Sequence, residues 1–208
     1  MVETHAGGAA VSLNALNLEL TDKVLLSDGD PAICDFWNLV IGAPEELQRR
    51  IRGREMKFDE VEERLVWIRE HKNDLMDGED AIERAFWKLV SHRCTFRGMG
   101  PIELRPQMEM IESWNNRRRD IAAEIRNLNR LLTGHVVDGK CVRRDALENI
   151  SVATADEFLF LDPPYWTKEA SDNPECHYVH GYSIEDHYDL RDALQDTRAD
   201  WMLTYGNP

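Results

Sequence analysis

The stretch Phe158–Tyr165 constrains this chain most, because four apolar residues run directly into the tetrapeptide Asp162-Pro163-Pro164-Tyr165. A short, continuous apolar run is typical of a strand covered on both faces of a sheet, and two consecutive prolines end any hydrogen-bonded ladder. In open α/β sheets, ligands gather where such strands end. The sequence therefore predicts a buried strand that delivers a site at its carboxyl end.

The tetrapeptide is rich in hydrogen-bond acceptors. Neither proline has an N–H group, so no neighbouring donor competes for the carbonyls of Asp162 and Pro163. The Asp162 carboxylate accepts further hydrogen bonds, and Tyr165 offers a flat ring for stacking. An aromatic amine fits this set, because its two N–H groups could reach Asp162 and the Pro163 carbonyl while its ring lies on Tyr165. The alternative is a tight loop with an exposed acid after a core strand.

Composition limits the class of protein. The 208 residues are enough for one core with an inserted subdomain, and 31% charged with 42% hydrophobic residues is ordinary for a globular protein. No apolar run approaches a membrane span, and the first residues lack the regions of a signal peptide, so we expect a cytoplasmic protein. The four cysteines are scattered, which fits reduced thiols better than a disulfide framework or a zinc site. We expect no metal.

The formal charge of −14 is an obstacle to nucleic-acid binding, because phosphate contacts need Lys and Arg. A basic surface must therefore be local. The alternative is that each basic cluster is a solvated helix face balanced by neighbouring acids. The two candidate clusters are Arg49, Arg50, Arg52, Arg54 and Lys57, and Arg117, Arg118, Arg119, Arg126 and Arg130.

Two early stretches have nucleotide-binding character. Gly7 and Gly8 lie between the end of an expected strand and the start of an expected helix, where they allow close backbone approach and the helix directs free N–H groups at the turn. A Gly-Gly pair alone also occurs in ordinary strand-to-helix turns. A second apolar run ends at Asp28, and an acid at the end of the second strand commonly holds ribose hydroxyls.

From about Pro44 to Leu132 the apolar residues recur every three or four positions, which predicts a helical insertion between the second and third strands. Residues 91–100 read as a polar loop in which His92, Arg93 and Arg97 could meet nucleic acid, although an ordinary connector fits equally well. The sheet resumes at residues 141–145 with Asp145 at a strand end. A helix from about residue 184 and a strand over 201–205 follow.

In this order, the elements resemble the Dam-type family of N6-adenine DNA methyltransferases over nearly the whole chain. Residues 2–13 resemble the family's donor-binding turn, residues 26–28 its ribose-binding acid, and residues 162–165 its catalytic tetrapeptide. The resemblance implies an α/β, Rossmann-like S-adenosylmethionine-dependent methyltransferase sheet built from residues 1–43 and 135–208. Residues 44–134 then form a helical subdomain in the place of the target-recognition region.

The resemblance also implies a function. The chain would be a site-specific DNA methyltransferase that moves a methyl group from S-adenosylmethionine to the N6 amino group of an adenine flipped out of double-stranded DNA. It would use no metal, and a restriction endonuclease would accompany it if it belongs to a restriction-modification system. The implied catalytic residues are Asp162, Pro163, Pro164 and Tyr165, and the implied donor-binding residues are Glu3, Ala6, Gly7, Gly8, Asp28 and Asp145.

Several features depart from the family pattern. Thr4-His5 stands where a Pro-Phe pair is usual, and Ser91-His92-Arg93 where an Asn-Arg pair is common. The usual segment before the first strand and the strands expected after Pro208 are absent, so we expect a truncated or split form that needs missing segments or a companion chain. Two alternatives remain open: a non-catalytic remnant acting as a DNA-binding or interaction module, and an RNA amino-methyltransferase.

Overall fold

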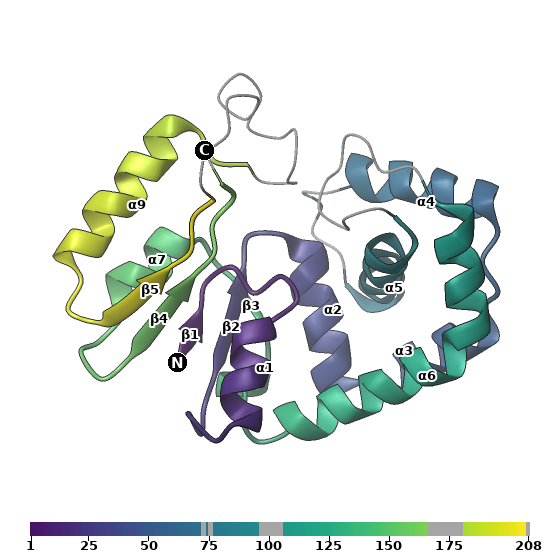
Figure 1. Cartoon of the computed structure of the whole chain (residues 1–208), viewed down its shortest axis with the longest axis horizontal. Coiled ribbons are helices and arrows are strands. Elements are labelled where there is room, and N and C mark those ends of the chain that lie inside the picture. Colours follow the sequence, from purple (N-terminus) through teal and green to yellow (C-terminus); the bar gives the residue numbers. More distant parts are fainter. Residues whose placement is uncertain (72–73, 75–76, 96–105, 166–180, 207–208) are drawn as a thin grey trace. The chain divides into compact units, whose positions relative to one another are not determined.

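The computed structural model describes residues 1–71, 74, 77–95, 106–165 and 181–206, which form two compact units (Figure 1). The α/β unit combines Met1–Asp30 with Gly134–Pro208, and the helical unit comprises Pro31–Thr133. Among the helices in these described ranges, none combines the length and apolarity that crossing a membrane requires.

Within the described part of the α/β unit, five parallel strands form a sheet in the order β3-β2-β1-β4-β5. Val2 of β1 pairs with Leu25 on one side and with Leu159 on the other. This arrangement confirms the expected α/β, Rossmann-like fold. The strands are β1 (Val2–Glu3), β2 (Leu25–Asp28), β3 (Val142–Arg143), β4 (Phe158–Leu161) and β5 (Asp200–Leu203).

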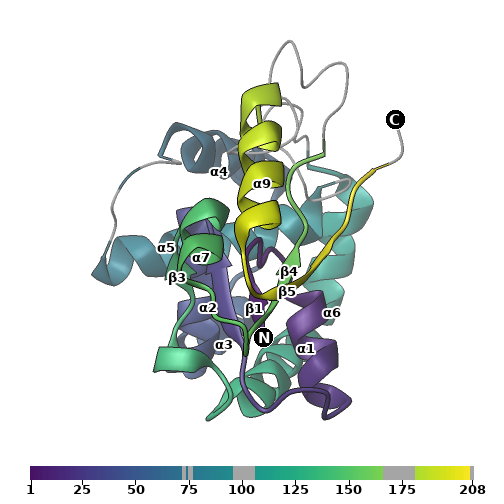
Figure 2. The ribbon, with the colours of Figure 1, turned by 90° about the vertical axis from the view of Figure 1, so that its left-hand side faces the viewer.

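The apolar run at residues 158–161 forms β4, as the sequence predicts. Leu159 and Leu161 have no exposed surface and pack in one cluster with Ile150 of α7 (Ala146–Val152) and Leu190 of α9 (Ile184–Asp196). The two helices lie on the face of the sheet opposite α1 (Ala10–Asn17) (Figure 2). Burial of these side chains fixes β4, and with it the position at which the tetrapeptide begins.

Two polar caps begin the helices of this cluster. The Asp145 carboxylate accepts the Leu147 N–H at 2.7 Å, which starts α7. Ser183 and Asp186 exchange side-chain-to-backbone bonds in a capping box that starts α9. Helix α7 was not predicted, because its seven residues are too few to display a helical period.

In its described residues the helical unit contains five helices, and Trp37, Phe86 and Trp114 are among the largest side chains buried in it. The Phe86 and Trp114 rings meet edge to face, with 6.1 Å between their centroids. Arg84, 2% exposed, donates to the Asp35 carboxylate at 2.6 Å and so ties α5 to α2. Because α2 packs on α5, the compact unit begins at Pro31, earlier than residue 44. The helices are α2 (Pro31–Gly42), α3 (Pro44–Gly53), α4 (Phe58–Glu70), α5 (Gly78–Cys94) and α6 (Met108–Leu132).

Candidate active site at the carboxyl edge of the sheet

The carboxyl edge of the sheet contains a topological switch point. From β1 the chain proceeds to β2 on one side, and it later returns to β4 on the other. Loops leaving neighbouring strands diverge at such a point and leave a crevice in which α/β proteins bind ligands. Gly7 follows β1, Asp28 is the last residue of β2, and Asp162 directly follows β4. Three of the expected site residues therefore belong to this edge.

Asp28 holds the glycine turn that follows β1. Its Oδ2 accepts the Gly7 N–H at 2.9 Å, and its Oδ1 accepts the Asp30 N–H at 2.8 Å. Gly7 has a φ of +45°, in the left-handed region that glycine adopts without strain because it has no side chain. Gly8 is exposed, with open space where a Cβ would stand. The turn thus presents bare backbone beside a carboxylate.

Glu3 and Ala6 fix this turn by hydrogen bonds to α1 and β2. Glu3 is 3% exposed, and its Oε2 accepts the Ser12 N–H at 2.9 Å in the first turn of α1. Burial raises the pKa of the Glu3 carboxyl, and the hydrogen bonds from Ser12 oppose that rise. Ala6 is buried and donates its N–H to the Ser27 carbonyl at 2.8 Å, which joins the turn to β2. Both residues shape the turn, and a direct contact with a donor stays a prediction.

Asp162 is the exposed carboxylate at the end of β4. Its Oδ1 accepts hydrogen bonds from the Tyr165 hydroxyl at 2.8 Å and from the Thr204 hydroxyl at 2.5 Å. The Thr204 N–H donates to the Leu161 carbonyl at 3.0 Å, so the pairing of β5 with β4 fixes Thr204. Within the described ranges, no hydrogen bond reaches Asp162 Oδ2. One oxygen is therefore anchored, while the other can accept a new donor.

Tyr165 is held on two sides. Its hydroxyl donates to Asp162, and this bond raises the pKa of Tyr165, so the hydroxyl keeps its proton at neutral pH. Its ring stacks on Tyr205 with 6.1 Å between centroids and 27° between planes. A Cβ at Gly206 would lie 2.9 Å from the Tyr165 ring, so Gly206 lets the chain pass close to it. Pro163 is buried and Pro164 half-buried, which makes the tetrapeptide rigid.

A series of His and Tyr rings, beginning at His5, also lies along this edge. His5 Nδ1 bonds the Thr4 hydroxyl at 2.9 Å, and His5 Nε2 bonds the Tyr182 hydroxyl at 3.1 Å. The Tyr182 ring lies 5.5 Å from that of His187, which bonds the Tyr205 hydroxyl through Nδ1. The contacts therefore lead from the glycine turn to the ring on which Tyr165 stacks.

Residues 1–206 match the sequence model of the D12 class N6 adenine-specific DNA methyltransferase family. The chain belongs to this family. Membership confirms the resemblance to the Dam-type enzymes and makes the chain a DNA adenine methyltransferase. Among curated proteins, none matches it.

The expected nucleic-acid contacts of this D12-class chain lie partly outside the described residues, because Arg97 falls there. His92 and Arg93 belong to the last turns of α5 and not to a loop, since Val90 and Cys94 continue the buried stripe of that helix. Arg93 pairs with Glu124 of α6 at 2.6 Å. A role for His92 and Arg93 at DNA stays a prediction.

Sequence reasoning missed Thr204, Tyr205 and the His5–Tyr182 pair. Thr204 and Tyr205 directly follow β5, the neighbour of β4, so their position at the end of a strand was the available signal. Asp145, expected near the donor, lies after β3 and caps α7. In the described part of this D12-class chain, no group of three His, Cys, Asp or Glu side chains is arranged to hold a metal ion.

His5 gives the D12-class chain a testable pH dependence. Desolvation lowers the pKa of His5 from 6.5 to about 4, against the opposing influence of Asp145 and Asp162. The unfolded chain therefore binds the His5 proton more readily between these pH values, and stability falls as the pH falls through this window. The unfolding free energy of the wild type should fall between pH 7 and pH 4.5. In the His5→Phe variant we expect this fall to be smaller by roughly 2 kcal/mol.

Urea unfolding of both proteins at the two pH values measures this effect. The carboxylates titrate in both proteins. The difference between the two dependences of stability on pH therefore isolates the contribution of His5. A difference in stability between wild type and variant that is the same at pH 7 and pH 4.5 would contradict the assignment.

Proposed function

We propose that this chain transfers a methyl group from S-adenosylmethionine to the N6 amino group of an adenine flipped out of double-stranded DNA. The observation that carries the proposal is the Asp162 carboxylate at the end of β4. Its Oδ1 accepts hydrogen bonds from two hydroxyls, and its Oδ2 has no partner among the described residues. The two prolines that follow have no backbone N–H group. Acceptors without a neighbouring donor suit the N–H groups of an amine.

The residues of the glycine turn suit the donor. S-adenosylmethionine carries a sulfonium, an ammonium group and a ribose diol, which carboxylates attract and accept. Asp28 would take the ribose hydroxyls, Asp145 would lie toward the donor's adenine, and Gly7 and Gly8 would lie beside its methionine part. The open space beside Gly8 supports this fit, because a side chain there would fill it. The bound donor supplies a methyl group that its sulfonium makes electrophilic.

The chain's own residues would orient the acceptor. One amino hydrogen of the adenine would be donated to Asp162 Oδ2 and the other to the Pro163 carbonyl, which directs the nitrogen lone pair away from both. The adenine ring would lie on Tyr165, whose hydroxyl bond to Asp162 and stack on Tyr205 set its plane. Positive charge develops on the nitrogen as the new bond forms, and the fixed Asp162 carboxylate stabilises it. As the nitrogen–carbon bond forms, the methyl–sulfur bond would break, and its electron pair would stay on the sulfur as a neutral thioether. The methylated nitrogen would then release one proton to solvent water.

Two measurements test this function. Calorimetric titration with S-adenosylmethionine asks whether the chain binds the donor. Incubation with donor carrying a labelled methyl group, and with duplexes that contain or lack adenine, asks where the methyl group goes. We expect N6-methyladenine in the adenine-containing duplex alone. Donor binding without methylation of either duplex would leave a non-catalytic module, and label in guanine of an RNA substrate would indicate an RNA amino-methyltransferase.

A further inference from the structure

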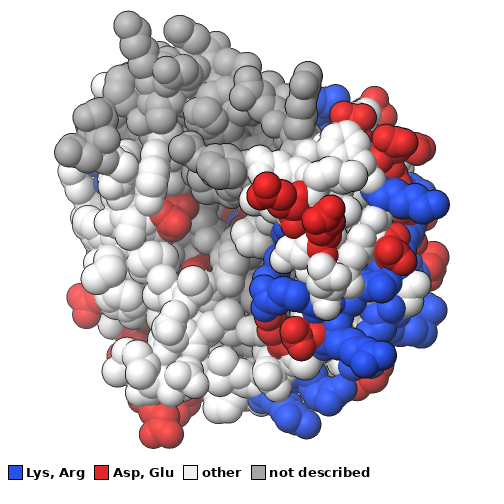
Figure 3. All heavy atoms as spheres, turned by 45° about the vertical axis from the view of Figure 1, so that its right-hand side comes forward, with Lys and Arg blue, Asp and Glu red and all other residues white. Residues whose placement is uncertain are grey.

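The negative charge of the chain is concentrated in one unit. The α/β unit contains 20 Asp and Glu against 7 Lys and Arg, whereas the helical unit contains 19 against 18. DNA is a polyanion, so the α/β unit repels it at long range and favourable phosphate contacts must come from elsewhere. Figure 3 shows Lys and Arg gathered over the helical unit.

Many of the helical unit's basic side chains are already neutralised. Arg49 and Arg50 both pair with Glu46, at 2.6 and 2.8 Å. Arg93 and Arg117 share Glu124, at 2.6 and 3.5 Å. A carboxylate lies against each of these guanidiniums, so their charge is balanced within the helical unit.

Three arginines of α6 differ. Arg119, Arg126 and Arg130 are all exposed, and no carboxylate of the described chain forms an ion pair with any of them. Their separations of seven and four positions place them on one stripe of the helix. At about 100° per residue, Asp120 and Glu124 project roughly 100° and 140° away from this stripe. The stripe thus keeps its positive charge.

Helix α3 adds a fourth arginine to the stripe. Arg52 donates to Gln48 Oε1 at 3.0 Å, and Arg126 donates to the same oxygen at 3.3 Å. Gln48 is 4% exposed, so its position is fixed by burial. A neutral amide therefore holds two guanidiniums from two helices without cancelling their charge. We call the four residues Arg52, Arg119, Arg126 and Arg130 the basic face.

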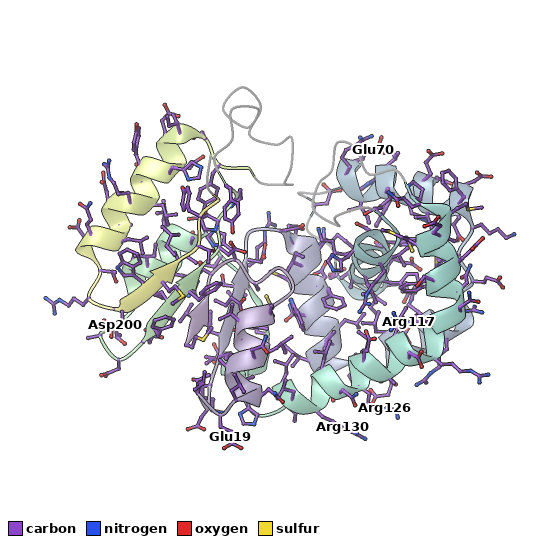
Figure 4. The ribbon with its side chains drawn as sticks, viewed as in Figure 1. Glu19, Glu70, Arg117, Arg126, Arg130 and Asp200 are labelled. Atoms are coloured by element: carbon purple, nitrogen blue, oxygen red, sulfur yellow. The ribbon has the colours of Figure 1, made fainter. Side chains whose placement is uncertain are left out.

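We propose that the basic face binds phosphates of the DNA backbone, a role that rests on the proposed function. A guanidinium matches phosphate oxygens with two parallel N–H groups and is desolvated more readily than an ammonium. Arg119 and Arg130, the ends of the α6 stripe, are eleven positions apart, about 16 Å along the helix, which is long enough to meet several phosphates. Arg126 and Arg130 project outward from α6, where a phosphate can approach them (Figure 4). Such contacts position the duplex and read no bases.

The test compares two double variants with equal loss of charge. Arg126→Gln with Arg130→Gln removes two cations from the basic face, whereas Arg49→Gln with Arg117→Gln removes two cations that are paired with Glu46 and Glu124. Binding of a short duplex is measured by fluorescence anisotropy over a range of salt concentrations. In the first variant we expect affinity at least tenfold lower and the slope of log K against log salt reduced by about 1.8. The paired-arginine control should retain a slope close to that of the wild type.

The possible results separate this inference from the proposed function. An unchanged slope in the first variant, or an equal reduction in both, overturns the role of the basic face while methylation by the wild type still supports the function. A wild-type chain that binds no duplex at low salt overturns both. The first variant could instead lose self-association while its duplex binding stays unchanged and the control keeps both. That result would assign the basic face to a second copy of the chain and would also overturn the proposal. Circular dichroism verifies that both variants remain folded.

Discussion

Asp162→Ala is expected to lower the rate of methyl transfer by roughly 10²- to 10³-fold or more, with donor affinity unchanged within about twofold. The substitution removes the acceptor that orients the amino group and the charge that stabilises the developing cation. The fold should be little affected, because Asp162 is exposed and Tyr165 and Thr204 can hydrogen-bond to water instead. Single-turnover methylation and calorimetric donor binding measure the two effects separately.

A matched control is Asp200→Ala. Asp200 is an equally exposed carboxylate of the same unit, but it lies at the amino end of β5, on the opposite edge of the sheet (Figure 4). Its loss should change the transfer rate by less than about twofold, as is usual for a surface site away from function. If the two variants were equally active, the catalytic role of Asp162 would be refuted.

The second large effect is expected from Asp28→Ala, which should weaken S-adenosylmethionine binding by about 10- to 100-fold. The variant loses the acceptor proposed for the ribose hydroxyls. It also loses the charge-assisted bonds from the Gly7 and Asp30 N–H groups, at 2.9 and 2.8 Å, that fix the turn. Titration calorimetry of wild type and variant gives the ratio directly.

Asp22→Ala removes the same charge from an exposed position that precedes β2, and it should bind the donor as the wild type does. An Asp28→Ala variant whose donor affinity equals that of this control would refute the ribose assignment. Donor binding that is lost together with the thermal transition would instead mean that Asp28 acts by stabilising the turn.

The sequence anticipated the features that depend on local pattern. The apolar runs that form β2 and β4 and the helical periods of the insertion were predicted correctly, because burial dictates both patterns. The position of Asp28 at the end of β2 followed from the same reasoning. Element boundaries were less secure, as shown by the continuation of α5 through Cys94.

The parts that could not be predicted depend on contacts between distant segments. Thr204 reaches Asp162 only because β5 pairs with β4, and His5 meets Tyr182 across 177 positions of the chain. Nor could the sequence separate paired from unpaired arginines, since Arg117 and Arg119 are near neighbours and only Arg117 meets Glu124. Side-chain partners depend on the assembled fold, which a local pattern does not contain.

The bond from Thr204 makes the position of the Asp162 carboxylate dependent on the outermost strand of the sheet. β5 has one neighbouring strand in the described structure, and its Trp201 and Met202 are 45% and 54% exposed, so little burial retains it. Weakly buried edge elements open before the remainder of a domain unfolds. Fraying of β5 would release Asp162 Oδ1 from Thr204 while the glycine turn, whose Gly7 and Ala6 bond to Asp28 and Ser27 of β2, stays intact. Mild denaturation would therefore uncouple donor binding from turnover.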